Sequence, residues 1–488
     1  MLRPTLRPDV LVVGGGTAAL CAAISAQSAG ASVLLLERAP AGERGGNTRH
    51  SRNFRYVHEG PSPYSAGPYP ETEFRRDLAR VAGSEQDPAL LRLLIERSRD
   101  LPDWLARLGV PLQPVASGGL PHSRKTAFLL GGGKTLLNAL YAAAERLGVV
   151  IRYGASVEAI QFEEPSAPKV VSRTAHKDAH RVAPKAVHSV DYSLEGGLHS
   201  VSPRLTILCS GGAQADREWL RTSWGERATG FINRGTPHAT SAVLRSLLSQ
   251  GVAAVGDPAA AYLVAVDARS PADDGGIVTR VRSMHAGIVV DRDGQRRYDE
   301  GADTASTRYS AWGQRLAAFP GQIGYLILDR RGLQVEAPSF YAPISAPCSA
   351  ELARQLKIPP LALERTLNAY NAAVRSTSTR DPQAPSSWCS EHLVPPKSSH
   401  ALPVTEPPFA AYPMRPGLTF TYHGIAVDAT LRVRHGDGGG GAIPNLFAAG
   451  MLMAPNLLSC GYLSGLALMI GLSTGRAAGE GAARALRS

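Results

Sequence analysis

Short apolar runs and one alanine-rich run follow each other at the start of the chain. Residues 9–13 are mostly apolar, residues 17–29 are rich in alanine, and residues 32–36 are apolar again and lead into Glu37. Short apolar runs between turn residues are typical of strands that are buried on both faces of a parallel sheet, whereas a longer run favours a helix. The pattern therefore predicts a strand, a helix and a second strand.

Residues 443–475 contain no charged residue and no histidine. This stretch is longer than the roughly 18 apolar residues that indicate a membrane-spanning helix. Two prolines, two asparagines and several glycines interrupt it, so no unbroken apolar helix of spanning length fits. We interpret it as a buried strand over residues 446–449, a glycine turn and a buried helix that begins near Leu463.

Two other stretches differ from this pattern. Residues 165–204 are basic and show no firm strand or helix period, so we interpret them as a solvated insertion between strands. A histidine metal site is the alternative there, but the irregular spacing of the four histidines disfavours it. These histidines are His176, His180, His188 and His199. Residues 380–408 are rich in proline and serine, and we interpret them as a surface excursion.

The composition is that of an ordinary globular protein, because 44% of the 488 residues are hydrophobic and 19% are charged. This length predicts two or three domains. The formal charge of +11 would suit nucleic-acid binding. However, the arginines are spread over the whole chain without a basic run, so we expect no nucleic-acid partner. We interpret the positive charge as a general surplus on the surface. The alternative is that it attracts a small anionic substrate.

The cysteines and the start of the chain limit the possible classes of protein further. The five cysteines are too scattered for a zinc, iron–sulfur or CxxC site, so the sequence predicts no metal centre. No charged and apolar leader precedes Asp9, and we therefore expect a cytoplasmic protein without a membrane span.

The turn after the first predicted strand carries the clearest chemistry. Residues 14–19 read Gly-Gly-Gly-Thr-Ala-Ala, the GxGxxA variant of the dinucleotide-binding fingerprint. Gly14 would make the tight turn, Gly16 would let the backbone approach a pyrophosphate, and Ala19 would let the helix pack on the sheet. The helix N-terminus would add free N–H groups and a positive dipole end. Glu37, 21 residues after Gly16, is placed to accept hydrogen bonds from a ribose diol.

A segment soon after Glu37 distinguishes FAD from NAD. Residues 44–55 read Arg-Gly-Gly-Asn-Thr-Arg-His-Ser-Arg-Asn-Phe-Arg. They resemble the Gly-Gly-Asn-Ser/Thr segment of the fumarate reductase and succinate dehydrogenase flavoprotein superfamily, and in particular are similar to the FAD-dependent tricarballylate dehydrogenases. Three further segments agree, at residues 130–134, 205–212 and 445–450. The resemblance runs from about residue 9 to residue 480, with a gap at the predicted insertion.

This resemblance implies an α/β fold. A discontinuous Rossmann-like FAD-binding domain would comprise residues 1–256 and 417–488, with an inserted α+β cap or substrate domain at residues 257–416. FAD would be held non-covalently, because no histidine stands where the covalently flavinylated relatives have theirs. The residues implied to bind FAD are Gly14, Gly15, Gly16, Thr17, Ala18, Ala19, Glu37, Arg38, Gly45, Gly46, Asn47, Thr48, Gly132, Gly133, Ser210, Gly211, Gly450, Met451, Tyr462 and Leu463.

The resemblance places the proton-transferring arginine of the cap at Arg308, on the order and spacing of the neighbouring segments. With a pKa above about 12, an arginine is a good clamp for a carboxylate but a reluctant base. The glutamate and the arginine of the family's upstream relay align here with Arg280 and Ser283, and Arg282 stands beside them. The relay therefore differs from that of the family, and Arg280 and Arg282 are candidates for holding an anionic substrate.

Two further positions concern the substrate and one concerns the flavin. His423 stands at about the place of a family histidine that holds a substrate carboxylate, whereas Tyr462 replaces an arginine, as it does in the tricarballylate-type enzymes. A tyrosine can hydrogen-bond a carboxylate or a carbonyl, while an arginine forks onto a carboxylate, so fumarate itself is disfavoured. Met451 stands where the family usually has a flavin-contacting acid, and its thioether would loosen or retune FAD.

The implied activity is oxidation or reduction of a C–C bond next to a carboxylate or carbonyl, by hydride transfer at flavin N5. Arg308, His423 and Tyr462 would be the catalytic residues, and a tricarballylate-like polycarboxylate is the expected substrate. Because no haem or cluster motif is present, electrons would pass to a quinone, dioxygen or a partner redox protein. The alternatives are a ketone-directed dehydrogenase or ene-reductase of the ketosteroid dehydrogenase type, a flavoprotein monooxygenase, and a non-catalytic FAD-binding assembly partner.

Overall fold

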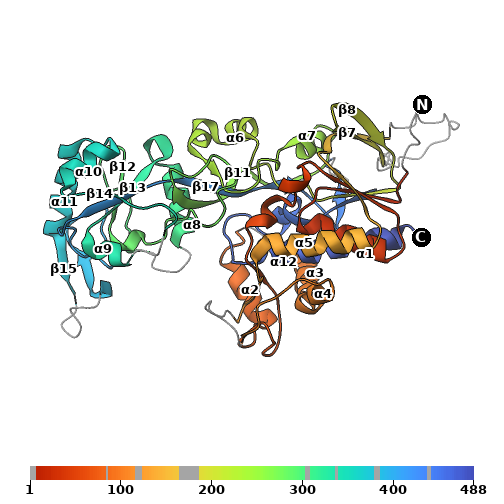
Figure 1. Cartoon of the computed structure of the whole chain (residues 1–488), viewed down its shortest axis with the longest axis horizontal. Coiled ribbons are helices and arrows are strands. Elements are labelled where there is room, and N and C mark those ends of the chain that lie inside the picture. Colours follow the sequence, from red (N-terminus) through yellow and green to blue (C-terminus); the bar gives the residue numbers. More distant parts are fainter. Residues whose placement is uncertain are drawn as a thin grey trace, which may run out of the picture. The chain divides into compact units, whose positions relative to one another are not determined.

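A computed structural model of the chain describes residues 7–83, 86–115, 124–163, 186–302, 308–335, 339–377, 385–436 and 441–488. The chain divides into two compact units (Figure 1). The first unit comprises residues 1–216, 238–261 and 420–488, and the second unit comprises residues 217–237 and 262–419. The predicted domain borders at 256 and 416 lie close to borders of these units, but residues 217–237 belong to the second unit.

The first unit is built on a six-stranded sheet. In spatial order its strands are β18 (Arg432–Arg434), β19 (Ala442–Ala448), β9 (Leu205–Leu208), β1 (Val10–Val13), β2 (Val33–Glu37) and β5 (Val150–Tyr153). β1 pairs in parallel with both β2 and β9, and all four of its residues are buried, as expected of a strand covered on both faces. Helix α1 (Thr17–Ser28) connects β1 to β2, which confirms the predicted strand, helix and strand and the α/β class.

Helix α12 (Leu466–Ala485) packs along α1 more closely than ordinary side chains would allow (Figure 1). A Cβ at Gly475 would clash with the carbonyl oxygen of Ala18, and a Cβ at Gly479 would clash with that of Ala22. The glycines therefore let the backbones of the two helices approach each other directly, as small residues do in close helix pairs.

The predicted buried helix near the end of the chain is confirmed, but it begins at Leu466 rather than near Leu463. Gly465, with a φ of +80°, forms its N-cap and ends the preceding loop. Within the described residues, we find no helix that combines the length and the apolar character needed to cross a membrane. The other helices and strands around this core are β3 (Asn53–Arg55), α2 (Glu71–Ala79), α3 (Pro88–Ser98), α4 (Leu101–Arg107), β4 (Thr126–Phe128), α5 (Gly132–Arg146) and α7 (Ala242–Leu248).

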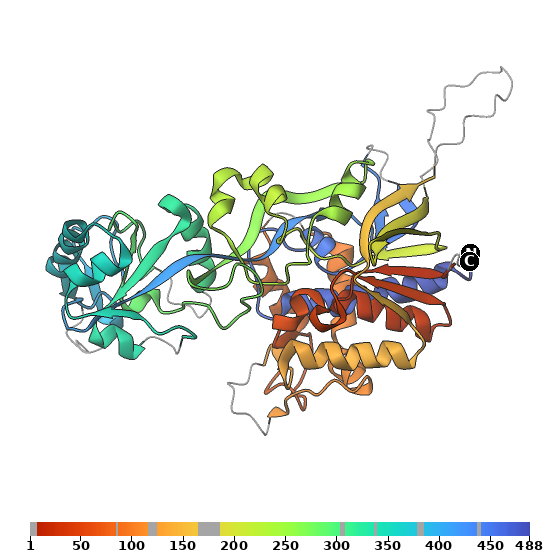
Figure 2. The same cartoon turned by 45° about the horizontal axis from the view of Figure 1, so that its top comes forward.

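An antiparallel three-stranded sheet lies beside the parallel sheet (Figure 2). Its strands are β6 (Ser156–Phe162), β7 (Val187–Leu194) and β8 (Gly197–Val201). The interpretation of residues 165–204 as an irregular insertion is therefore wrong for β7 and β8, which carry the exposed His188 and His199. A register shift opposite Phe162 breaks the alternation of β7, and this hides the strand period in the sequence. His176 and His180 lie outside the described residues.

The second unit contains a mixed sheet with helices. Its strands are β10 (Ile232–Asn233), β17 (Phe409–Ile425), β13 (Gly324–Leu328) and β12 (Ile288–Asp291), and β11 (Ala254–Asp267) and β14 (Ile344–Ala346) also pair with β17. β11 and β17 each cross the border between the two units in sequence. The helices are α6 (Arg217–Trp224), α8 (Arg308–Ala317), α9 (Arg330–Val335), α10 (Ser349–Leu356) and α11 (Pro360–Ala373), and β15 (Val374–Ser376) pairs with β16 (Trp388–Ser390).

Part of the proline- and serine-rich stretch belongs to the core of this unit. Ala401 and Val404 pack in a buried cluster, and Lys397 is fully buried. The Nζ of Lys397 donates hydrogen bonds to the carbonyl oxygens of His285 at 2.9 Å and Gly287 at 2.6 Å. The interpretation of residues 380–408 as a surface excursion is therefore wrong for residues 397–404, because composition alone does not reveal a few inward-facing side chains.

The buried ammonium of Lys397 makes stability depend on pH. Burial lowers the pKa of Lys397 to about 8, from 10.5 in an exposed lysine. Between these values the unfolded chain binds a proton that the folded chain has lost, so folding gains roughly 3 kcal/mol as pH rises through this window. We expect the unfolding free energy of wild type minus that of Lys397→Met to increase from pH 8 to 10, as measured by urea denaturation. A difference that does not change with pH would contradict the lowered pKa of Lys397.

Candidate functional site

The turn between β1 and α1 is packed against neighbouring chain in a way that requires glycine. Gly14 has a φ of +111°, and a Cβ there would lie 2.5 Å from the carbonyl oxygen of Cys209, at the end of β9. A Cβ at Gly15 would clash with the carboxylate of Glu37 and the hydroxyl of Tyr141. Gly16 is the N-cap of α1 and provides no side-chain cap, so the first N–H groups of the helix are left for other acceptors.

Glu37 ends β2 with its carboxylate turned toward this turn. Only 5% of the residue is exposed, and its Oε1 accepts a hydrogen bond from the backbone N–H of Ala39 at 2.7 Å. Burial raises the pKa of Glu37, although hydrogen bonds from the backbone N–H groups of Ala39, Gly45 and Gly15 act in the opposite direction. A carboxylate in this position can accept hydrogen bonds from a diol at the edge of the turn.

Tyr141 of α5 is a site residue that the sequence did not reveal. Its hydroxyl donates a hydrogen bond to the carbonyl oxygen of Gly15 at 2.8 Å. The guanidinium of Arg44 lies 4.4 Å from the centre of the Tyr141 ring and 5.6 Å from that of Tyr153, which is a cation–π arrangement. No local pattern could have identified Tyr141, because Arg44 and Gly15 are distant from it in the sequence.

The segment after Arg44 approaches the same turn. Gly45 has a φ of +104° and is followed by a short helical turn, η2 (Gly46–His50). The hydroxyl of Thr48 accepts hydrogen bonds from the backbone N–H and the hydroxyl of Thr17, at 3.2 and 2.9 Å. The start of α5 packs against η2, because Gly133 donates a backbone hydrogen bond to Ser51 at 2.7 Å.

Three more segments with predicted site residues belong to this unit. Ser210 and Gly211 follow Cys209, the first residue after β9. The backbone N–H of Gly450 donates a hydrogen bond to the hydroxyl of Thr474 on α12 at 2.9 Å, and the partly buried Met451 follows it. Arg38 donates to the hydroxyl of Thr240.

These residues fit a bound dinucleotide. A Cβ at Gly46 or at Gly211 would meet no other atom of the described residues within 4 Å, so the space beside both glycines is open. The uncapped start of α1 offers N–H groups and a positive dipole end for a pyrophosphate, and Glu37 offers acceptors for a ribose diol. The glycine turn, Glu37, η2 and the start of α5 thus form a cradle that could hold FAD. The role of the predicted cofactor residues stays a prediction.

His423 and Tyr462 lie on neighbouring segments beside this cradle. The hydroxyl of Tyr422 donates a hydrogen bond to the carbonyl oxygen of Gly461 at 2.6 Å, and the rings of Phe420 and Tyr462 meet edge to face with centroids 5.6 Å apart. His423 lies next on β17, with its Nδ1 3.3 Å from the carbonyl oxygen of Gly256. Burial lowers the pKa of His423, which favours the neutral imidazole.

The predicted arginines belong to the second unit. Arg280 is almost buried, and its Nε donates a hydrogen bond to the carbonyl oxygen of Ile277 at 3.0 Å. Arg282 is partly exposed. Arg308 is the first residue of α8, and its side chain lies outside the described residues. A role of these three arginines in binding or catalysis stays a prediction.

Comparisons with known proteins identify a family and two relatives. The profile of a family described as "FAD binding domain" matches residues 9–466. A fumarate reductase (cytochrome) of Shewanella frigidimarina is 26% identical over 491 residues, which cover 98% of this chain and 77% of that protein. An NADH:fumarate oxidoreductase of Klebsiella pneumoniae is 24% identical and matches 86% of this chain, but only 42% of its own length.

Two solved structures share the fold. The open conformation of a flavocytochrome c3 fumarate reductase matches with a TM-score of 0.70 at 21% identity, over 99% of this chain and 79% of that chain. A 3-ketosteroid Δ1-dehydrogenase of Sterolibacterium denitrificans matches with a TM-score of 0.71 at 16% identity, over 98% of this chain and 99% of that chain. At these identities the similarity establishes the fold and not the substrate.

The purified chain is expected to hold FAD without a covalent bond. Acid precipitation should release all of the flavin into the supernatant, where its absorbance can be measured. Flavin that stays with the washed precipitate would contradict this expectation.

Glu37→Ala should weaken FAD binding, because the ribose diol loses a charged acceptor. A hydrogen bond to a charged group contributes about 1.5–3 kcal/mol, so the dissociation constant should rise roughly 10- to 100-fold. Titration of the apoprotein with FAD, followed by quenching of flavin fluorescence, measures this constant. Glu145→Ala, which removes an exposed carboxylate from α5, serves as the control and should bind FAD like wild type. Equal constants for all three proteins would argue against the assignment of Glu37.

Proposed function

The chain belongs to the family described as the FAD binding domain, and from this membership we propose that it oxidises or reduces a C–C bond next to a carboxylate or a carbonyl. It is an FAD-dependent oxidoreductase. When bound, FAD accepts or donates the hydride, and the residues of the chain provide position and charge. The turn at residues 14–16, Glu37 and η2 would hold the dinucleotide, and the Tyr462 loop, defined as residues 459–465, would border the reacting end.

One observation carries this proposal: His423 and Tyr462 lie on neighbouring segments of the unit that holds the cradle. The contact between Phe420 and Tyr462 and the hydrogen bond from Tyr422 to Gly461 join the end of β17 to the Tyr462 loop. By the resemblance described above, His423 would stand at about the place of a substrate-binding histidine, and Tyr462 would replace a substrate-binding arginine. They could orient a carboxylate or carbonyl by hydrogen bonds while the carbon beside it reacts.

We propose a tricarballylate-like polycarboxylate as the substrate. Arg308 would exchange the proton on the carbon next to the one that loses or gains the hydride, and Arg280 and Arg282 would attract the remaining carboxylates. The formal charge of +11 supports an anionic substrate, since a positive surplus raises the local concentration of anions. Electrons would pass to a quinone, dioxygen or a separate redox protein, and the cytoplasm is the proposed location.

A ketone substrate is the second candidate, and the aromatic side chains at the Tyr462 loop favour it. The ring of Phe420 contacts that of Tyr462, the hydroxyl of Tyr422 donates to Gly461, and burial lowers the pKa of His423. Such surroundings suit polarisation of a carbonyl by a tyrosine hydroxyl better than binding of several carboxylates. Anaerobic absorbance of the yellow enzyme, mixed in turn with polycarboxylates and with cyclic ketones, distinguishes the two. Bleaching by a ketone alone would overturn the polycarboxylate proposal, and bleaching by neither class would overturn both.

Arg308→Lys separates proton transfer from binding. If Arg308 transfers the proton, lysine keeps the charge but loses the planar fork, and turnover should fall at least about a hundredfold. If it only clamps a carboxylate, the Michaelis constant should rise while turnover stays within about tenfold of wild type. Steady-state kinetics with the substrate that bleaches the flavin measures both quantities, after retained FAD absorbance has been shown.

The matched control for this experiment is Arg315→Lys on the same helix. Arg315 lies over the rings of Trp312 and Tyr298, at 4.9 and 5.3 Å, and has a structural explanation of its own. Arg315→Lys should leave the turnover number and the Michaelis constant near those of wild type. If Arg308→Lys also leaves both unchanged, Arg308 lies outside the site.

A further inference from the structure

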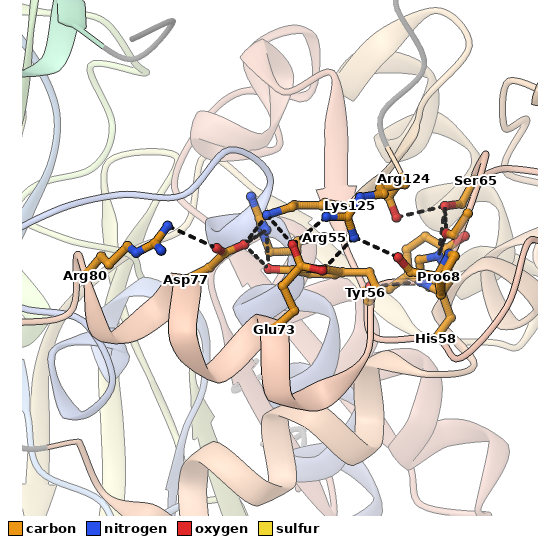
Figure 3. A network of polar contacts seen from close by, with 12 residues as sticks. Arg55, Tyr56, His58, Ser65, Pro68, Glu73, Asp77, Arg80, Arg124 and Lys125 are labelled. Atoms are coloured by element: carbon orange, nitrogen blue, oxygen red, sulfur yellow. Dashed lines mark hydrogen bonds and ion pairs between the residues drawn. The ribbon is translucent and has the colours of Figure 1, made fainter. Parts of the chain in front are cut away.

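A group of buried and half-buried charges lies next to the Tyr462 loop and has no role in the proposed reaction (Figure 3). We call it the Arg55 cluster, and it consists of Arg55, Tyr69, Glu73, Asp77 and Lys125. Three separate parts of the chain contribute to it, namely β3, α2 with the residues just before it, and the residues just before β4. The cluster therefore joins segments that are distant in the sequence.

The contacts within the cluster form a continuous chain. Arg55 donates to the hydroxyl of Tyr69, which in turn donates to Asp77 at 2.9 Å, and Nη1 of Arg55 lies 3.6 Å from Oδ2 of Asp77. The Nζ of Lys125 lies 2.5 Å from Asp77 and 2.9 Å from Glu73. The side chains of Arg55 and Asp77 are only 7% and 9% exposed, so they are held in a region from which most water is excluded.

The carboxylates of the cluster stay ionised at neutral pH. Hydrogen bonds from Arg124 and Lys125 lower the pKa of Glu73 to about 2. Burial opposes ionisation of Asp77, but hydrogen bonds from Lys125 and Tyr69 and the charges of Lys125 and Arg55 outweigh it and lower its pKa. Because buried ion pairs contribute little net stability compared with apolar packing, the geometry that this cluster imposes calls for an explanation.

Arg55 connects the cluster to the end of the Tyr462 loop. Its backbone N–H donates a hydrogen bond to the carbonyl oxygen of Gly465 at 3.1 Å, and its Nε donates to the carbonyl oxygen of Ser464 at 3.2 Å. Asn53, two residues earlier on β3, donates to the hydroxyl of Ser464 at 3.2 Å. The guanidinium thus bridges the loop on one side and Asp77 on the other.

The start of the same loop is also held from α2. The backbone N–H groups of Ser459 and Gly461 donate to the carbonyl oxygens of Ala82 and Val81, at 2.8 and 2.7 Å, in the turn that follows α2. The start of the Tyr462 loop is therefore bound to the turn that follows α2. The end of the loop is connected to α2 itself through Arg55 and Asp77. Tyr462 and Leu463 lie between the two attachments.

We propose that Arg55 is a positioning residue that sets the geometry of Tyr462 and Leu463 through the end of their loop. The role of Tyr462 toward the flavin and substrate rests on the proposed function, whereas the attachment of the loop does not. The guanidinium of Arg55 can contact the loop and Asp77 at the same time, because it has donors that point in two directions from one rigid plane. A lysine has a single ammonium, which cannot occupy both positions.

The experiment compares Arg55→Lys and Arg55→Met with wild type and with Glu71→Gln. Glu71 lies on α2 and forms exposed salt bridges with Arg75 and Arg99, so Glu71→Gln removes two ion pairs outside the Arg55 cluster. Amide hydrogen exchange of residues 459–467 is measured first, on the apoprotein. Visible circular dichroism of bound FAD and the affinity of sulfite for the flavin are measured next, since both report the surroundings of the flavin ring without any substrate.

We expect exchange in the loop to rise at least about tenfold in both Arg55 variants and the dichroism and sulfite affinity to change, while Glu71→Gln behaves like wild type. With a substrate, the rate of flavin reduction should fall by about ten- to a hundredfold, as small misplacements do, while the FAD dissociation constant stays within about threefold. If Arg55→Met does not fold, Arg55→Lys and Asp77→Asn provide the same readouts, because both keep the shape and most contacts of the cluster.

Unchanged exchange, dichroism and sulfite affinity in Arg55→Lys would overturn the proposal, even if the enzyme reduces a polycarboxylate as expected. Changed exchange and dichroism would support it even if no tested substrate bleaches wild type, in which case only the proposed function fails. Equal changes in Glu71→Gln would also overturn it, since the effect would then come from any loss of charge on α2.

Discussion

The direct backbone contact between α1 and α12 sets the arrangement of the first unit. Gly475 lies at the level of Ala18 and Gly479 at the level of Ala22, so the two helices run in the same direction. In this register, Leu466 at the start of α12 lies about 12 Å beyond Thr17 at the start of α1, at 1.5 Å per residue. The Tyr462 loop consequently extends past the dinucleotide turn. With larger residues in place of the glycines, the helices would separate, and the loop and the turn would lose their relative position.

Local patterns predicted the elements that local sequence determines. The buried strands β1 and β2, the glycine turn, α1 and Glu37 follow from apolar runs and one fingerprint, because each depends on residues within a short window. β7 was missed because a register shift breaks its alternation. Lys397 was missed because a basic residue in a stretch rich in proline gives no sign that its Nζ will meet two buried carbonyl groups. The helix start at Leu466 was misplaced by three residues because Gly465 ends the loop.

The candidate site also has a part that local sequence predicts and a part that it does not. Its cofactor side was predicted from glycines and an acid at fixed spacing, which a pyrophosphate and a ribose require, and the structure brings Gly15 and Glu37 together. Tyr141, Arg55 and Asp77 were not predictable, because their contacts join segments far apart in the chain and no period or motif marks them. Tyr462 and His423 were found only by resemblance. The structure adds that the ring of Phe420 contacts Tyr462 and that burial lowers the pKa of His423.

The pairing of α1 with α12 also bears on how the protein is made. α1 leaves the ribosome early, whereas α12 is synthesised several hundred residues later, which takes about half a minute or more at typical rates of translation. β1 lacks its neighbour β9 until β9 has been synthesised. The face of α1 that α12 covers stays open to water until α12 follows. Contacts between such distant segments slow folding, and they leave the apolar segment at β1 and α1 exposed to aggregation until α12 has been synthesised.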